Sequence, residues 1–306
     1  MTSFLRGDGR ALTVVEGFRE RVLSYRPSVS PTAGWTEEQL TASAEKKRRR
    51  FERMHSTLEG WFGPLDGARV LDVGCGDGAN CVLLAAEAVR LAVGLDLRLR
   101  LFAPDGEGEV VRRLIERVDA AATRSGRAAA SHRPARFVNM DATRLGFRPD
   151  SFDLVISRSA AEHIQPIERA LHETCRVVRP GGLVYLSIDP FFWLRGCHKR
   201  GVVDLPFAHA RLSLPEYRRF VAETEGEARA AKRAGRLATL NRFTVSDWRR
   251  SIESHAWEVL GWTERPSELG AAILRENPEI MDTLLPGVEE RDLLTERIDV
   301  WLRRRR

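Results

Sequence analysis

The chain alternates between short, almost continuously apolar runs and longer amphipathic runs. The short runs are rich in Val, Ile and Leu, as in buried strands, and the longer runs repeat apolar residues at helical spacing. This pattern predicts strands at 69–74, 90–97, 135–142, 152–159 and 183–188. It predicts helices between them at 79–88, 109–122 and 167–178. Such an order predicts an α/β fold with a doubly wound, mainly parallel sheet.

The alternation stops after the fifth strand. Residues 189–243 begin with aromatic side chains and continue as a run rich in Ala, Arg and Glu, which predicts an inserted helical lid over the ligand cleft. The alternation resumes with a sixth strand at 257–264. A shorter helical insert at 266–285 then precedes a seventh strand at 295–303.

The N-terminal part has a different pattern. Residues 1–34 contain several Pro and Gly breakers and are expected to be a loosely organised leader. Thr36 and Gln39 fit a capping box, which predicts that a helix begins near residue 37. A basic amphipathic helix is expected over 45–62 and ends before a Gly-Pro pair.

Composition narrows the class of protein. At 306 residues the chain can form one large α/β domain with insertions, and its 43% apolar and 30% charged residues are ordinary for a globular protein. No stretch approaches the roughly 18 apolar residues that span a bilayer, and the charged first residues do not predict a secretory signal. The four cysteines lack Cys-x-x-Cys spacing, which favours reduced thiols and a cytoplasmic protein.

The net charge of +6 raises the question of nucleic-acid binding. Much of the excess lies in two runs, 46–50 and 303–306. Phe51, Met54 and Leu58 follow the first run at helical spacing, so we interpret it as the solvated face of a helix. This interpretation makes a nucleic-acid partner less favoured. The positive charge still leaves an anionic substrate open.

A glycine loop follows the first predicted strand, in the sequence VLDVGCGDGAN. Gly74, Gly76 and Gly78 occupy alternate positions, and Asp72 and Asp77 flank them. A dinucleotide fingerprint requires Gly-x-Gly-x-x-Gly and a helix N-terminus free for a pyrophosphate. Two carboxylates would repel a diphosphate, whereas they suit a ligand that carries an ammonium and a sulfonium.

Two further carboxylates end the next strands. Asp96 lies about 20 residues beyond the glycines, where it can hold a ribose diol, although an N-cap role is the alternative. Asp141 ends the third strand and could accept a hydrogen bond from an adenine amine, or form a turn. The sequence predicts that both lie at the ligand-binding edge of the sheet.

Four motifs occur in a familiar order: DVGCGDG, GLD, NMDATRLGFRPDSFDLVIS and VVRPGGLVYLSI. Together they resemble the class I S-adenosylmethionine-dependent methyltransferases, over residues 68–188 and more weakly over 244–264 and 290–304. The resemblance implies a Rossmann-like sheet of seven strands with the last antiparallel, S-adenosyl-L-methionine as cofactor, and methyl transfer as activity. It implies a domain over 63–306 that carries the lid, preceded by an N-terminal helical cap over 1–62.

The resemblance also implies roles for single residues. The residues beside the methionine part of the cofactor would be Asp72, Gly74, Cys75 and Gly76. The remaining contacts would be Asp96 with the ribose, Leu97, Asp141 and Ala142 around adenine, and Ser157 facing the reactive methyl.

The segment SRSAAEHI brings candidate catalytic groups near the methyl donor: Ser157, Arg158 and His163, with Glu162 beside them. Methyl transfer depends mainly on alignment, and a base is needed only if the nucleophile carries a proton. His163 is the best candidate for that base, because an imidazole titrates near neutral pH. Its alternative role is to orient the loop.

The lid supplies the groups expected around an acceptor, which are Asp189, Trp193, His198, Asp204, His209 and Tyr217. His198 and His209 lack metal-ligand spacing, so no metal site is expected. The expected acceptor is a small molecule, with oxygen favoured slightly over nitrogen or carbon, and the lid arginines leave room for an anionic or glycosylated metabolite. Small-molecule biosynthesis is the function class that this favours.

Three alternatives remain. The protein could bind the cofactor and catalyse another reaction, because fold does not dictate chemistry. A nucleic-acid methyltransferase is disfavoured because no Asn/Asp-Pro-Pro-Tyr motif follows the fourth strand. A nicotinamide oxidoreductase is disfavoured by the glycine spacing. The oligomeric state is left open, with a homodimer as one alternative.

Overall fold

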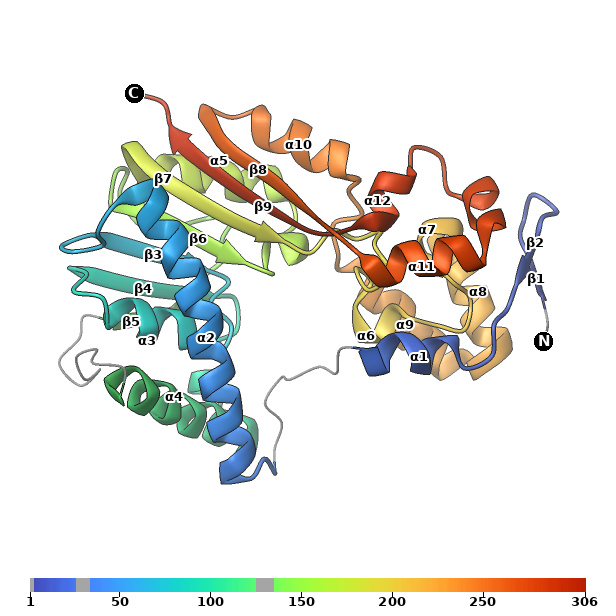
Figure 1. Ribbon diagram of the computed structural model, residues 1–306, viewed down its shortest axis with the longest axis horizontal. Coiled ribbons are helices and arrows are strands. Elements are labelled where there is room, and N and C mark those ends of the chain that lie inside the picture. The colour runs from blue at the N-terminus through green and yellow to red at the C-terminus, as the bar shows by residue number, and fades with distance from the viewer. Residues whose placement is uncertain (1–2, 26–33, 125–134) are drawn as a thin grey trace.

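The computed structural model describes residues 3–25, 34–124 and 135–306. Its centre is a seven-stranded sheet in the order β5-β4-β3-β6-β7-β9-β8 (Figure 1). The strands are β3 (Arg69–Val73), β4 (Leu91–Asp96), β5 (Ala135–Asn139), β6 (Phe152–Arg158), β7 (Val178–Ile188), β8 (Trp257–Pro266) and β9 (Thr295–Arg304). β3 to β7 pair in parallel, whereas β9 is antiparallel to both of its neighbours. The predicted fold class is confirmed.

Helices cover both faces of the sheet. The buried apolar side chains of one face join those of α2 (Glu37–Phe62), α3 (Ala79–Ala85) and α4 (Gly106–Arg124). Those of the other face join α5 (Ile167–Val177) and α10 (Val245–Glu253). β3 and β6 are therefore buried on both sides, which explains why their sequences are apolar without alternation.

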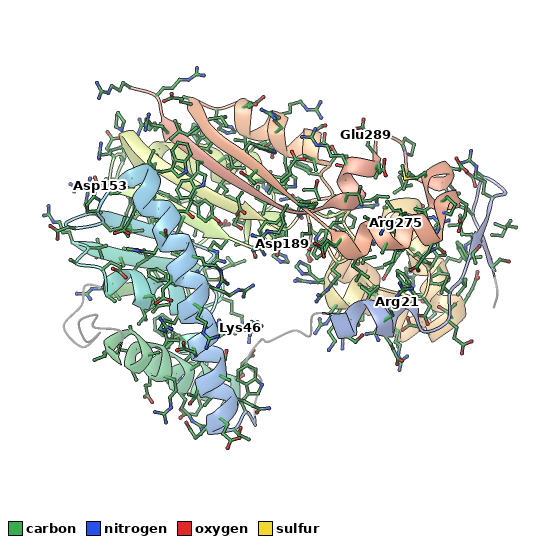
Figure 2. All side chains as sticks on the ribbon, viewed as in Figure 1. Arg21, Lys46, Asp153, Asp189, Arg275 and Glu289 are labelled. Carbon is green, nitrogen blue, oxygen red and sulfur yellow. The ribbon has the colours of Figure 1, made fainter. Side chains whose placement is uncertain are left out.

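The predicted helix starts at 37 and near 45 belong to one helix. α2 begins after Thr36, whose side chain accepts a hydrogen bond from the Gln39 amide in a complete capping box. Leu40, Phe51 and Leu58 are buried against the sheet, while Lys46 lies on the exposed side (Figure 2). The basic run is thus mainly the outer surface of a helix, as the sequence indicates.

The start of β7 differs from the expectation of a strand at 183–188. The strand begins at Val178, which pairs with Phe152, and the register shifts between Phe152 and Leu154. Gly181 has a φ of 75° within this irregular part. The Arg-Pro-Gly-Gly sequence therefore forms a bulged strand instead of a loop, because glycine accepts the left-handed conformation that the bulge requires.

A second body, here called the helical module, lies beyond the carboxyl ends of β6 and β7 (Figure 1). Its insert contains α6 (His198–Gly201), α7 (Ala208–Arg211), α8 (Leu214–Glu225) and α9 (Glu227–Ala238). Its C-terminal part contains α11 (Glu268–Glu276), the 3-10 turn η4 (Pro278–Thr283) and α12 (Glu290–Leu294). Both predicted helical inserts are therefore present.

The expected loose leader is wrong for the described N-terminal residues. They form a hairpin of β1 (Ser3–Leu5) and β2 (Ala11–Thr13), followed by α1 (Phe18–Tyr25). Phe4 and Phe18 are buried in the apolar cluster of the helical module. Breakers in the sequence mark turns, but they do not reveal that the apolar residues between them have distant partners.

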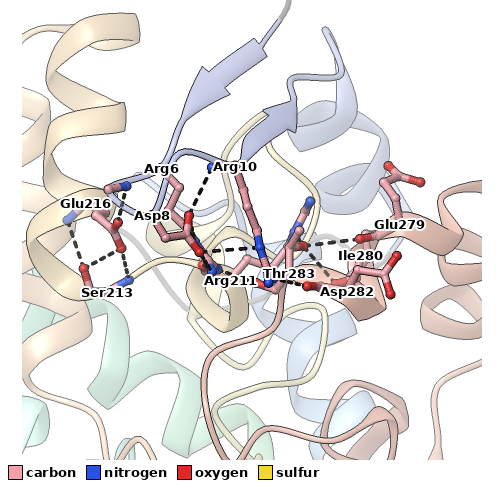
Figure 3. Close-up of polar contacts among 11 residues, drawn as sticks. Arg6, Asp8, Arg10, Arg211, Ser213, Glu216, Glu279, Ile280, Asp282 and Thr283 are labelled. Atoms are coloured by element: carbon pink, nitrogen blue, oxygen red, sulfur yellow. Dashed lines mark hydrogen bonds and ion pairs between the residues drawn. The ribbon is translucent and has the colours of Figure 1, made fainter.

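Polar contacts hold the hairpin in place (Figure 3). The Arg6 guanidinium donates to the carbonyl oxygens of Arg211, at 3.0 Å, and of Thr283, at 2.6 Å. The Gly7 amide donates to Glu216 Oε1 at 2.9 Å. The stretch 1–62 therefore contacts two bodies, its first part the helical module and α2 the sheet, while the domain boundary at residue 62 stays a prediction. No helix in the described ranges is long and apolar enough to cross a membrane.

Candidate functional site

The glycine loop folds tightly at the carboxyl end of β3. Gly74, Gly76 and Gly78 have φ angles of 73°, 59° and 84°, which glycine adopts at little cost. A Cβ atom on Gly74 would lie 2.3 Å from the Cβ of Ala160, whereas one on Gly76 would meet nothing within 4 Å. The loop therefore needs glycine for packing at Gly74, and at Gly76 it leaves open space against the backbone.

Asp96 faces that open space from the end of β4. Its Oδ2 accepts a hydrogen bond from the Gly76 amide at 3.0 Å, and its Oδ1 accepts one from Arg98 at 3.1 Å. The next short helix, η1 (Arg100–Phe102), has Leu99 at its N-cap, so Asp96 is not a cap. Leu97 beside it is 76% exposed. A carboxylate and an exposed apolar side chain at one loop fit a ribose and an adenine.

The two carboxylates that flank the glycine loop, Asp72 and Asp77, differ in burial and in pairing. Asp77 pairs with Lys47 of α2 at 2.5 Å. Asp72 is 1% exposed and its Oδ2 has no hydrogen-bond partner among the described residues. Burial, reinforced by Asp77 and Asp96 and opposed by Arg158, raises the pKa of Asp72 to about 7. A buried, unpartnered carboxylate fits a cationic ligand, so this part of the loop suits the amino-acid end of S-adenosylmethionine.

Cys75 contributes to the loop through its backbone. Its amide, like that of Gly74, donates to the Leu95 carbonyl oxygen, at 2.9 and 2.8 Å respectively. Its side chain is buried against β4, and a Cβ on Gly94 would come 2.9 Å from the Cys75 sulfur. Burial raises the pKa of this thiol, so the residue is placed for packing.

The residues expected around adenine adopt a turn. Oδ1 of Asp141 accepts hydrogen bonds from the amide and the hydroxyl of Thr143, both at 2.8 Å. Asp141 is exposed, and Ala142 packs against the apolar cluster of that face. The turn role foreseen as an alternative is therefore present, and a contact with adenine stays a prediction.

Ser157 and Arg158 end β6 next to the glycine loop. The Ser157 hydroxyl is buried and donates to the Val73 carbonyl oxygen at 2.9 Å. Arg158 is half-buried, and its Nε has no hydrogen-bond partner among the described residues. Burial lowers its pKa, while Tyr185 and Asp72 oppose that shift. Ser157 thus serves the packing of the loop, and Arg158 offers an incompletely paired cation.

The 3-10 turn η3 (Ala161–His163) carries the other candidates. Burial, with smaller contributions from His198 and Arg236 and opposed by Asp189, lowers the pKa of His163 to about 3. A neutral imidazole with so low a pKa is a weak base at pH 7. The role of His163 as a general base therefore stays a prediction that its surroundings do not favour.

Asn241 was not foreseen from the sequence. Its side-chain amide donates to the carbonyl oxygens of Ala161, at 3.0 Å, and Ile164, at 2.8 Å. Its backbone amide donates to the Glu162 carbonyl oxygen at 2.8 Å. These bonds join the end of the insert to η3, and no local sequence signal marks them because the partners lie about 80 residues away.

The predicted lid residues separate into two groups. His209 Nε2 donates to the Trp193 carbonyl oxygen at 3.0 Å, and the Tyr217 hydroxyl donates to the Gly201 carbonyl oxygen at 2.9 Å. Asp204 accepts from the Arg19 amide at 2.8 Å, so these three hold the module together. Asp189 lies where the sheet meets the module and pairs with Arg297 at 2.9 Å (Figure 2).

Comparisons with known proteins agree with this geometry. Residues 71–186 match the family described as a methyltransferase domain. The chain is 31% identical to a ubiquinone biosynthesis O-methyltransferase of Rhizobium rhizogenes, over 40% of this chain and 42% of that one. It is 31% identical to a phthiotriol/phenolphthiotriol dimycocerosates methyltransferase of Mycobacterium leprae, over 60% and 58%. The chain spans about half the length of the curated relatives that it matches.

Solved structures that resemble this fold share less sequence identity with the chain. An S-adenosylmethionine-dependent methyltransferase from Mesorhizobium loti has 16% identity and a TM-score of 0.46, with 81% of this chain and 96% of that one covered. The match at 71–186 contains the glycine loop, Asp96 and Asp141. Over residues 71–186 the chain therefore matches the methyltransferase family that its sequence resembles, and these residues lie within that match.

Proposed function

We propose that the protein transfers the methyl group of S-adenosylmethionine to an oxygen atom of a small molecule. The observation that carries the proposal is the open space at Gly76, whose amide donates to Asp96 Oδ2 at 3.0 Å, in a loop that follows the buried Asp72 with its unpartnered Oδ2. The similarity to an O-methyltransferase of Rhizobium rhizogenes supports oxygen as the acceptor atom. The cofactor, when bound, supplies an electrophilic methyl on a sulfonium.

The residues of this chain would bind, orient and exclude water. Asp96 would hold the ribose, Leu97 would cover adenine, and Asp72 would face the cationic amino-acid end. Because methyl transfer is an in-line displacement, alignment contributes much of the rate. The helical module lies beyond the carboxyl ends of β6 and β7 (Figure 1), which are at the same edge of the parallel sheet as those of β3 and β4, so it would close the site and seat the acceptor.

An anionic acceptor is supported by the cations near this edge. Arg158 is half-buried, with a buried Nε that has no hydrogen-bond partner among the described residues, and Arg297 is half-buried beside Asp189. Arg50 of α2 is exposed as a residue, yet partial desolvation of its guanidinium and the charges of Arg158 and Arg297 lower its pKa. A carboxylate, phosphate or phenolate on the acceptor would relieve this repulsion.

Product analysis tests the proposal. The protein is incubated with methyl-labelled S-adenosylmethionine and a panel of hydroxylated small molecules, carboxylated and neutral in matched pairs. We expect S-adenosylhomocysteine and a labelled methyl ether to form together, with faster turnover for the carboxylated member. Acceptor-dependent consumption of the cofactor without S-adenosylhomocysteine would show another reaction, and labelled RNA or DNA would show a nucleic-acid substrate.

A further inference from the structure

Glu162, His163 and His198 form a cluster to which the proposed function, as stated above, assigns no role. One ligand atom from each, a carboxylate oxygen or an imidazole nitrogen, lies within 4.8 Å of the other two. Among the described residues, this is the group of three such side chains close enough to hold a metal ion. It joins the two bodies, because Glu162 and His163 belong to η3 and His198 begins α6 of the helical module.

Three polar atoms of the cluster have no hydrogen bond of ordinary geometry among the described residues. Glu162 is 1% exposed, and neither of its carboxylate oxygens has a hydrogen bond of ordinary geometry among the described residues. Nε2 of His198 is buried and unpartnered as well. Leaving a buried carboxylate unpaired costs several kcal/mol, so such a group is usually neutralised by a proton or a cation.

Two further observations point to a cation. The imidazoles of His163 and His198 are stacked, with ring centroids 4.8 Å apart and an interplanar angle of 14°. His198 also has a φ of 56°, a left-handed conformation that is strained for a non-glycine residue and is common at functional sites.

We propose that Glu162, His163 and His198 bind a divalent transition metal ion of the Zn²⁺ type. Two imidazoles and one carboxylate are the ligands of catalytic zinc sites, which keep a further position open. Bond lengths of about 2.0–2.2 Å place tetrahedral ligand atoms about 3.3 Å apart, so small side-chain rotations from the present spacing suffice.

The surrounding charges limit what else the metal would bind. Asp189 is already paired with Arg297, and Arg236 faces both histidines and Glu162. A divalent ion therefore meets one free negative charge, that of Glu162, with Arg236 opposing it. The charge balance favours one anionic oxygen at the open position, and if the proposed function is right this is the deprotonated acceptor oxygen.

Metal titration of the full chain tests the site without reference to activity. The chelator-treated protein is titrated with Co²⁺, followed by visible absorption, and with Zn²⁺, followed by calorimetry. Two variants remove ligands with little change of shape, Glu162→Gln and His198→Gln. His172→Gln, at an exposed histidine of α5, is the matched control.

We expect about one equivalent of Co²⁺ to bind wild type and His172→Gln with d–d bands of low coordination number. Affinity is expected to fall by at least about 100-fold in each ligand variant, while thermal melting confirms that both are folded. Equal Co²⁺ affinity in wild type and Glu162→Gln would overturn the proposal, as would no binding to wild type. Binding of Co²⁺ by a protein that does not bind S-adenosylhomocysteine would refute the proposed function and leave the metal site standing.

Discussion

The sheet and the helical module are built from the chain in different ways. The strands of the sheet pair mainly with near neighbours in sequence, and its ligand loop follows the first of them directly. The helical module takes residues from the N-terminus, from the insert after β7 and from the segment between β8 and β9. Local pattern therefore describes the first region well, whereas the second depends on contacts between distant segments.

Single contacts illustrate the difference. Phe4 packs edge-on against Phe220 with ring centroids 5.3 Å apart, and the Val15 amide donates to the Asp204 carbonyl oxygen at 2.8 Å. Neither pair can be foreseen from spacing. The two regions are also expected to have different roles. The proposed cofactor-binding residues lie on the sheet, and the acceptor-binding residues are expected where the sheet meets the module.

The largest expected effect is the loss of stability when an aromatic ring is removed from the helical module or from the sheet. Phe220→Ala and Phe152→Ala each leave a cavity, and we expect each to lower the free energy of unfolding by about 3–5 kcal/mol. Only Phe152→Ala should also weaken S-adenosylhomocysteine binding, since Phe152 begins the strand that supports the loop. Urea unfolding and calorimetry measure both quantities, and equal loss of binding in the two variants would contradict the expected difference in roles.

The next test compares two glycines of one loop. Gly74→Ala and Gly76→Ala both place a side chain at a left-handed φ, which costs about 1–2 kcal/mol. Gly74→Ala adds a Cβ 2.3 Å from Ala160, so its unfolding free energy should fall further than that of Gly76→Ala. Gly76→Ala should instead show the greater loss of ligand affinity relative to its loss of stability, because its methyl would enter the open space. Thermal melts with and without ligand measure this, and the reverse order would show that the ligand lies elsewhere.

The connection between the regions can be weakened at Asn241. Asn241→Ala removes the side-chain hydrogen bonds to the carbonyl oxygens of Ala161 and Ile164, and only the first of these still accepts from another amide, that of Ile164 at 3.1 Å. We expect this loss to cost about 1–3 kcal/mol. We expect turnover to fall while the affinity for S-adenosylhomocysteine stays within about twofold of wild type. Steady-state kinetics and calorimetry distinguish these effects, and a parallel loss of both would mean that η3 belongs to the cofactor site.

The last test concerns the pH dependence due to Asp72. Its pKa is raised in the folded protein to about 7 from an ordinary 3.8, so between these values the folded state holds the extra proton. This group therefore stabilises the fold fully at low pH and loses that contribution as the pH rises towards 7, by up to about 1.4 kcal/mol per pH unit. The difference in unfolding free energy between wild type and Asp72→Asn, measured from pH 4 to 8, should decrease with this sign. A difference that is independent of pH would show that Asp72 is charged throughout.

The difference between local patterns and distant contacts explains which features could be predicted from the sequence. The succession of strands and helices and the glycine loop follow from periodicity and a local motif. The antiparallel last strand and the role of Asp96 follow from the family resemblance that rests on that periodicity and motif. The hairpin at Phe4, the bond from Asn241 to η3 and the pairing of Arg297 with Asp189 join residues more than 75 positions apart. Such contacts are fixed by packing in three dimensions, which no window of sequence contains.

The cluster of Glu162, His163 and His198 is the clearest example of residues that only the three-dimensional packing brings together. His198 and His209 were considered together because both lie in the insert, yet His209 is used against Trp193 and Phe191. His198 instead meets His163, from the predicted catalytic segment. Only the packing of the module on η3 brings these two rings together. The expected cytoplasmic location and the homodimer stay predictions.

The central claim is that the loop at Gly76 holds S-adenosylmethionine through Asp96, and calorimetry with S-adenosylhomocysteine tests it most directly. We expect wild type to bind and Asp96→Ala to bind more weakly by about 1–3 kcal/mol, the scale of hydrogen bonds to a charged group. Unchanged affinity in Asp96→Ala, or binding of NADH in place of S-adenosylhomocysteine, would contradict the account.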